Sequence, residues 1–92
     1  MLLSLLKIHG HSMQSTIVNG QKVLVSSIPF IFSNPKKNDI VAFRLGNEIF
    51  IKRISKIENN KYFLEGDNKN DSFDSRKLGT IERKNILGKV IF

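Results

Sequence analysis

Apolar and polar residues alternate along most of the chain, as they do in strands that have one buried face. No segment keeps a helical spacing of apolar residues for more than about two turns. The clearest unit lies between Asp39 and Ile54, where two alternating runs flank Gly46-Asn47, a dipeptide suited to a two-residue hairpin turn. This turn predicts a register that pairs Leu45 with Glu48, Phe43 with Phe50, and Val41 with Lys52.

The register of this hairpin also predicts which side chains share a face of the sheet. One face would carry Val41, Phe43, Leu45, Phe50 and Lys52. The other would carry Ile40, Ala42, Ile49 and Ile51. Lys52 would therefore emerge among apolar neighbours.

The remaining pattern predicts further strands joined by polar connections. We expect strands over residues 22–26, 54–58, 61–65 and 86–92, with a second hairpin turn at Asn59-Asn60. Residues 29–38 and 66–79 are expected to be a connecting loop and a structured polar loop. The prediction is a mainly β fold, a compact antiparallel domain of hairpins with little helix, and a single domain over residues 1–92.

Composition narrows the chemistry. The 92 residues include no cysteine, which excludes a thiol nucleophile, a disulfide framework and a cysteine-based zinc site. The net charge of +7 at first favours a nucleic-acid partner, but the basic residues form short pairs without a long tract or interleaved aromatics. We therefore expect no nucleic-acid partner.

The first six residues are apolar, but Lys7 ends the run well short of the roughly 20 residues of a membrane-spanning helix. The run also lacks the basic start and the cleavage site of a secretory signal. The sequence thus predicts no transmembrane segment and leaves peripheral docking on a bilayer open.

Ser12 is a candidate nucleophile in the turn that follows the apolar start. A serine needs a base and a backbone N–H for the oxyanion, and Gly10 would allow a substrate to approach closely. His11 is adjacent and points to the other side, so it is a poor base. His9 and His11 share a face but lack a third metal ligand, and we expect no metal and no cofactor.

Lys52 is the better candidate base because its predicted neighbours are apolar. Burial favours the uncharged amine, and lowering its pKa from about 10.4 to about 8 costs roughly 3 kcal/mol. The alternative is a lysine that extends its amine to water.

Four ordered sequence blocks closely resemble the type I signal peptidases. Residues 66–79 contain Gly-Asp-Asn, then Ser-Phe-Asp-Ser-Arg and a following glycine, as in the signature of that family. Gly10-His11-Ser12-Met13 with Thr16 is similar to its nucleophile motif. Residues 38–43 and 50–54 are similar to its Gly-Asp-Ile-Val-x-Phe and Tyr-Ile-Lys-Arg-Val strands.

The resemblance implies a serine endopeptidase that cleaves a signal or pro-segment after a small residue through an acyl-enzyme. Ser12 would be the nucleophile, Lys52 the general base and Ser72 the residue that orients the amine. Asp74 and Arg76 would pair to fix their loop. A polypeptide substrate would bind as an extended strand, with pockets shaped by Ile8, Gly10, Met13, Ile17, Phe50 and Ile51.

The chain also departs from the family. Ser15 replaces the usual proline, and only about a dozen residues separate the Lys52 strand from Gly66, too few for the accessory β-domain of many members. With no anchor expected, it would be a cytoplasmic relative, similar to proteases that mature nickel-type superoxide dismutase, or a reduced signal peptidase recruited to the membrane. An inactive peptide-binding module and a self-cleaving, repressor-type protease remain as alternatives.

Overall fold

Short strands account for most of the secondary structure. The computed structural model describes residues 3–68 and 79–92. The elements are β1 (Leu3–Lys7), β2 (Lys22–Ser26), α1 (Pro29–Phe32), β3 (Ile40–Leu45), β4 (Glu48–Glu58), β5 (Lys61–Glu65), β6 (Ile81–Glu82), the 3₁₀ turn η1 (Arg83–Asn85) and β7 (Ile86–Val90). The prediction of a compact, mainly antiparallel β fold with little helix is confirmed.

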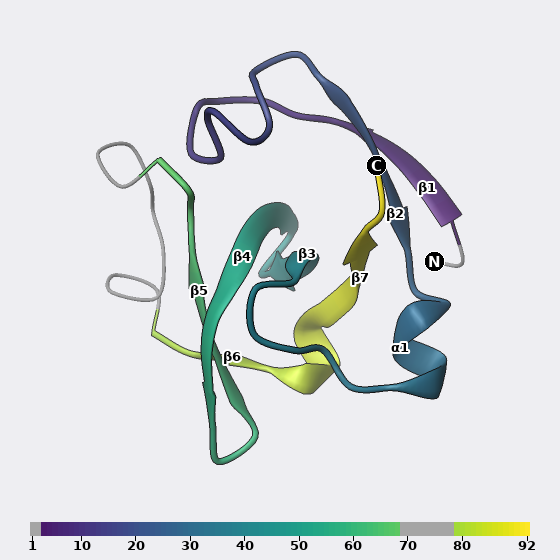
Figure 1. The fold of residues 1–92 in the computed structure, drawn as a ribbon, viewed down its shortest axis with the longest axis vertical. Coiled ribbons are helices and arrows are strands. Elements are labelled where there is room, and N and C mark those ends of the chain that lie inside the picture. The colour runs from purple at the N-terminus through teal and green to yellow at the C-terminus, as the bar shows by residue number, and fades with distance from the viewer. Residues whose placement is uncertain (1–2, 69–78) are drawn as a thin grey trace.

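The strands form one seven-stranded sheet in the order β1-β2-β7-β3-β4-β5-β6 (Figure 1). Strand β4 is long and changes partner, because residues 48–53 pair with β3 whereas residues 53–58 pair with β5. Within the described residues, the outer edge of β4 over residues 48–52 has no strand partner, and β1 pairs only with β2. Both of these strand edges are therefore open among the described residues.

The β3–β4 hairpin has the predicted register, including Val41 opposite Lys52. Its two faces contribute to two separate cores, as the alternation predicted. Ile40 and Ala42 belong to one core, and Val41 and Phe43 to the other. The rings of Phe43 and Phe50 stack with their centroids 5.6 Å apart.

The second hairpin turns at Asn59-Asn60 as predicted, and both residues have positive φ angles of 53° and 64°. A type I′ turn requires this conformation at both central positions, and asparagine tolerates it well. The preceding strand is not separate, however, because residues 54–58 continue β4.

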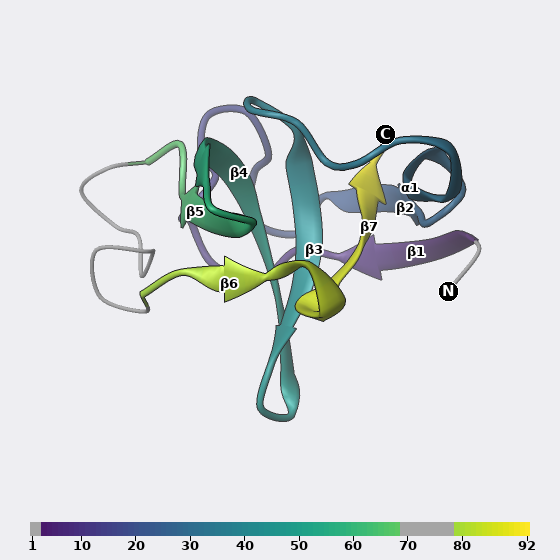
Figure 2. The same ribbon diagram turned by 90° about the horizontal axis from the view of Figure 1, so that it is seen from below.

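Two expectations about other segments need correction, and one strand was not predicted. The loop predicted over residues 29–38 begins with a helical turn, since Pro29 is preset for a first helical position and accepts a hydrogen bond from the Ser33 N–H at 3.2 Å. The apolar start forms strand β1, which pairs with β2 (Figure 2). The last strand ends at Val90 rather than at residue 92.

Within the described ranges, neither short helical turn has the length and apolar composition of a membrane span.

Candidate active site

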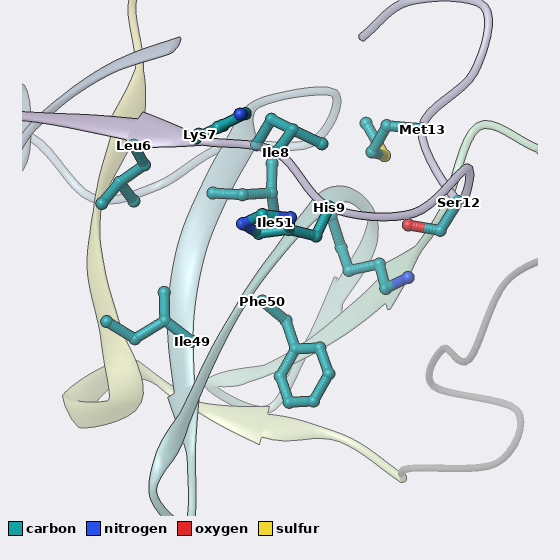
Figure 3. A pocket seen from close by; sticks show the side chains of 10 residues that line it. Leu6, Lys7, Ile8, His9, Ser12, Met13, Ile49, Phe50 and Ile51 are labelled. Carbon is teal, nitrogen blue, oxygen red and sulfur yellow. The ribbon is translucent and has the colours of Figure 1, made fainter. Parts of the chain in front are cut away.

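A pocket of about 290 Å³ lies between the end of β1 and the first half of β4 (Figure 3). Residues 6–9 line one side, residues 49–52 line the other, and Ser12 and Met13 complete it. Side chains alternate across a strand, so a run of consecutive lining residues means that the strand edge itself faces the pocket. The open edges of β1 and β4 therefore border the pocket.

Ser12 lies in the turn that leaves β1, and its hydroxyl points into the pocket (Figure 3). Hydrogen bonds close the base of this turn, from Ile8 N–H to the Gln21 carbonyl and from Gly20 N–H to the Ile8 carbonyl, both at 2.8 Å. In the part of the chain that the structure describes, the Ser12 N–H donates to no protein acceptor. This donor is thus available to a bound group.

Lys52 reaches the same pocket from strand β4, where it is paired with Val41. Only 3% of the residue is exposed, which is exceptional for a lysine. Burial of this kind disfavours the charged form of an amine. The fold therefore brings the predicted nucleophile and the predicted base to one pocket from separate elements.

An ion pair links the strand of Lys52 to the turn of Ser12. Arg53 donates to both oxygens of Asp67 through Nε at 2.9 Å and Nη2 at 2.8 Å. The same carboxylate accepts the hydroxyl of Thr16 at 2.5 Å. Hydrogen bonding to Asp67, followed by its charge, raises the pKa of Arg53 further above its ordinary value against an opposing effect of burial. We call Thr16, Arg53 and Asp67 the carboxylate clamp.

Asn68 holds the turn that contains Ser12 directly. Its backbone N–H donates to the Ser12 carbonyl at 2.8 Å, and its side-chain amide donates to the His11 carbonyl at 3.1 Å. The Asp67 N–H also contacts the Met13 sulfur at 3.4 Å. Asn68 therefore holds the backbone at His11 and Ser12, and Asp67 contacts the side chain of Met13.

The sequence assigned no role to the clamp or to Asn68. A signal for them was present, because Thr16, Arg53 and Gly66-Asp67-Asn68 all lie in the blocks that resemble signal peptidases. What the sequence did not reveal was that these blocks contact one another.

The six predicted substrate-pocket residues divide into two groups. Ile8, Met13, Phe50 and Ile51 line the pocket. Ile17 is not among the lining residues and is fully buried in the core with Ile8 and Met13. Gly10 is exposed and also outside the lining, with a left-handed φ of 94° and an N–H that donates to Asn19 at 2.9 Å.

Three further predicted residues, Ser72, Asp74 and Arg76, lie outside the described residues. His9 lines the pocket, and His11 hydrogen-bonds Gln14 at 3.0 Å. Across residues 3–68 and 79–92, no three His, Asp or Glu side chains are grouped as metal ligands.

Comparison with known proteins gives a family for this arrangement. A sequence model of the Peptidase S24-like family matches residues 3–91. Signal peptidase I of Bacillus licheniformis is 36% identical over 72 residues, which cover 77% of this chain and 36% of that protein. Signal peptidase I V of Bacillus subtilis is 53% identical over 36 residues, 39% of this chain and 21% of that protein.

An inactive member is also similar. Inactive signal peptidase IA of Staphylococcus aureus is 23% identical over 128 residues, which cover 90% of this chain and 74% of that protein. The chain spans well under half the length of the two Bacillus relatives.

The mainly β fold and the sequence matches together define the class of protein, a family of peptidases. The chain belongs to the Peptidase S24-like family, and its resemblance to type I signal peptidases is confirmed.

Proposed function

We propose that the protein is a serine endopeptidase that uses Ser12 as nucleophile and Lys52 as general base to cleave a polypeptide after a small residue. The observation that supports this most is the shared pocket, in which a serine hydroxyl and a lysine that is 3% exposed are both lining groups. Burial favours the uncharged lysine, the form that can accept a proton.

In this proposal the Lys52 amine takes the proton of Ser12 while the serine oxygen attacks the scissile carbonyl. The backbone N–H of Ser12 stabilises the oxyanion. Collapse of the intermediate breaks the C–N bond, and the Lys52 ammonium returns its proton to the leaving amine. Water then attacks the acyl-enzyme by the same route and restores Ser12.

The substrate would enter as an extended strand between the edges of β1 and β4. Both edges border the pocket and have no further strand partner among the described residues. Main-chain hydrogen bonds to these edges would set the register, and Ile8, Met13, Phe50 and Ile51 would form the side-chain pockets. By resemblance to signal peptidases, Ser72 would orient the amine, and Asp74 and Arg76 would pair.

The test is cleavage of a peptide that carries small residues before the scissile bond, followed by mass spectrometry. Wild-type protein should cut at one bond, and Ser12→Ala should reduce kcat/KM by at least about a thousandfold. A Ser15→Ala variant is the control, because it removes a hydroxyl from the same turn outside the pocket lining. Equal activity of Ser12→Ala and wild type would refute the proposal.

A second candidate is a peptide-binding module without catalysis. It is favoured by the similarity to an inactive relative over 90% of this chain. The two functions differ in a single result, because a module of this kind would bind the test peptide and leave it intact, in wild type and Ser12→Ala alike.

A further inference from the structure

The β1 side of the candidate pocket carries basic side chains. Lys7 and His9 both line the pocket and are exposed (Figure 3). No Asp or Glu is among the described residues that line it. Glu48, at the start of β4, lies just outside the lining. A substrate side chain on the β1 side would therefore meet positive charge from Lys7.

Lys22 places a second positive charge beside Lys7. The two residues are directly paired between β1 and β2, so their side chains share a face of the sheet. Like charges directly opposite one another destabilise a pair of strands. Among the described residues, neither amine forms an ion pair. We call Lys7 and Lys22 the lysine pair, and added negative charge would stabilise it.

The segment that contains the lysine pair has no carboxylate of its own. Residues 1–38, which include β1, the Ser12 turn and β2, contain four lysines and no Asp or Glu. Asp67 reaches this segment through Thr16, but both of its oxygens already accept hydrogen bonds from Arg53. A bound carboxylate would therefore complement a charge that the described residues leave uncompensated.

A strand bound along the open edge of β1 would bring alternate side chains to the lysine pair. Ile8 is buried, whereas Lys7 and His9 on either side of it are exposed. Residues directly opposite one another in paired strands share a face. A substrate side chain beside Ile8 would thus face the apolar pocket, and its neighbours in the substrate would lie on the face of Lys7.

We propose that the pocket prefers polypeptides with Asp or Glu between two small residues before the cleaved bond, and that the lysine pair determines this preference. The binding mode, a strand along β1, rests on the proposed function. Lys7 would lie on the strand next to the carboxylate. Lys22 would act from two strand spacings away, about 10 Å, which is close to the Debye length at about 0.1 M salt. A lysine at the same substrate position would be repelled.

Three peptides that differ only at this position, with Glu, Gln or Lys, test the preference. Glutamine matches glutamate in size and lacks its charge. At about 20 mM ionic strength, kcat/KM for the Glu peptide should exceed that for the Gln peptide about three- to fivefold and that for the Lys peptide at least about tenfold. About 0.5 M NaCl should reduce both ratios to less than about twofold, because both lysines are exposed.

Charge variants assign the preference to the lysine pair. Lys7→Gln should abolish most of the ratio between the Glu and Gln peptides, and Lys22→Gln should lower it less. Lys7→Glu/Lys22→Glu should reverse the preference in favour of the Lys peptide. Lys61→Glu/Lys84→Glu is the matched control, because it changes the net charge equally at exposed residues outside the lining, and it should keep the ratio within about twofold of wild type. Removing the like-charge pair should not lower the melting temperature.

Binding of the labelled peptides to Ser12→Ala, followed by fluorescence anisotropy, separates this preference from the proposed function. Tighter binding of the Glu peptide, without cleavage by wild type, would support the preference and refute the proposed function. Equal cleavage of the three peptides at low salt would overturn the preference and leave the proposed function standing. A preference for Glu that persists in Lys7→Glu/Lys22→Glu would also overturn it, because the carboxylate would then be recognised elsewhere.

Discussion

Ser12 and Lys52 line the same pocket, but the chain holds them in different ways. Lys52 belongs to a regular strand, and its place follows from the turn at Gly46-Asn47 and the alternation around it. Ser12 belongs to an irregular turn whose backbone is held by Asn68 and by the carboxylate clamp. The proposed base is thus positioned by local sequence, and the proposed nucleophile by contacts made across the fold.

The largest effect is expected from removing the amine. Lys52→Met keeps the length and apolar character of the side chain, so the fold should remain. Cleavage should fall by at least about a thousandfold, because Lys52 is the lining residue that is proposed to accept the proton of Ser12. Methionine keeps most of the buried apolar packing of the side chain, so the melting temperature should fall by only a few degrees. Peptide cleavage and thermal unfolding measure the two effects, and a large drop in melting temperature would mean that Lys52 is chiefly structural.

The next effect should come from the carboxylate clamp. Asp67→Asn places an amide NH₂ against donors from Arg53 or Thr16, which should loosen the Ser12 turn while Lys52 stays on its strand. Losing one charged hydrogen-bonding partner typically costs about 1–3 kcal/mol, so kcat/KM should fall by roughly ten- to a hundredfold. Glu58→Gln is the control, because it breaks an exposed ion pair with Lys56 that is worth little. Equal activities of the two variants would show that the clamp does not position Ser12.

A smaller effect is expected at Asn68. Asn68→Ala removes the side-chain bond to the His11 carbonyl but leaves the backbone bond to Ser12. Since a neutral hydrogen bond contributes about 0.5–1.5 kcal/mol, we expect kcat to fall by only about three- to tenfold. Steady-state kinetics with the test peptide would measure it, and a loss as large as that of Asp67→Asn would place most of the restraint on Asn68 instead.

The smallest effect on cleavage should come from the second hairpin. Asn60→Ala puts an alanine at a φ of 64°, which should cost about 1 kcal/mol of unfolding free energy. Cleavage by the folded protein should not change, because neither this turn nor its neighbours line the pocket. Urea unfolding and peptide cleavage check both parts, and a loss of cleavage would connect this hairpin to the site.

Positions set by local sequence could be predicted, whereas positions set by contacts across the fold could not. The residues at Gly46-Asn47 and Asn59-Asn60 favour tight two-residue turns. The positions of both hairpins, and the face of the sheet on which Lys52 lies, could therefore be predicted. Strand β1 could not be predicted, because its residues do not alternate between apolar and polar: Leu3, Leu5 and Leu6 are all apolar. Its exposure alternates only because it pairs with β2 and turns Leu6 toward the core.

The site residues divide similarly. Ser12, Lys52 and four of the pocket residues could be proposed from motifs, and the structure lines one pocket with them. Thr16, Arg53 and Asp67 form a three-way contact between distant segments. No spacing rule predicts such a contact, because it depends on how the segments pack.

The most direct test of the account is covalent trapping of Ser12. Wild-type protein is incubated with an acylating inhibitor of signal peptidases, and the intact mass and the modified residue are then determined. One adduct on Ser12 is expected in wild type, and none in Ser12→Ala or Lys52→Met. Absence of an adduct in wild type, or an adduct of equal yield in Lys52→Met, would contradict the claim that the buried amine activates this hydroxyl.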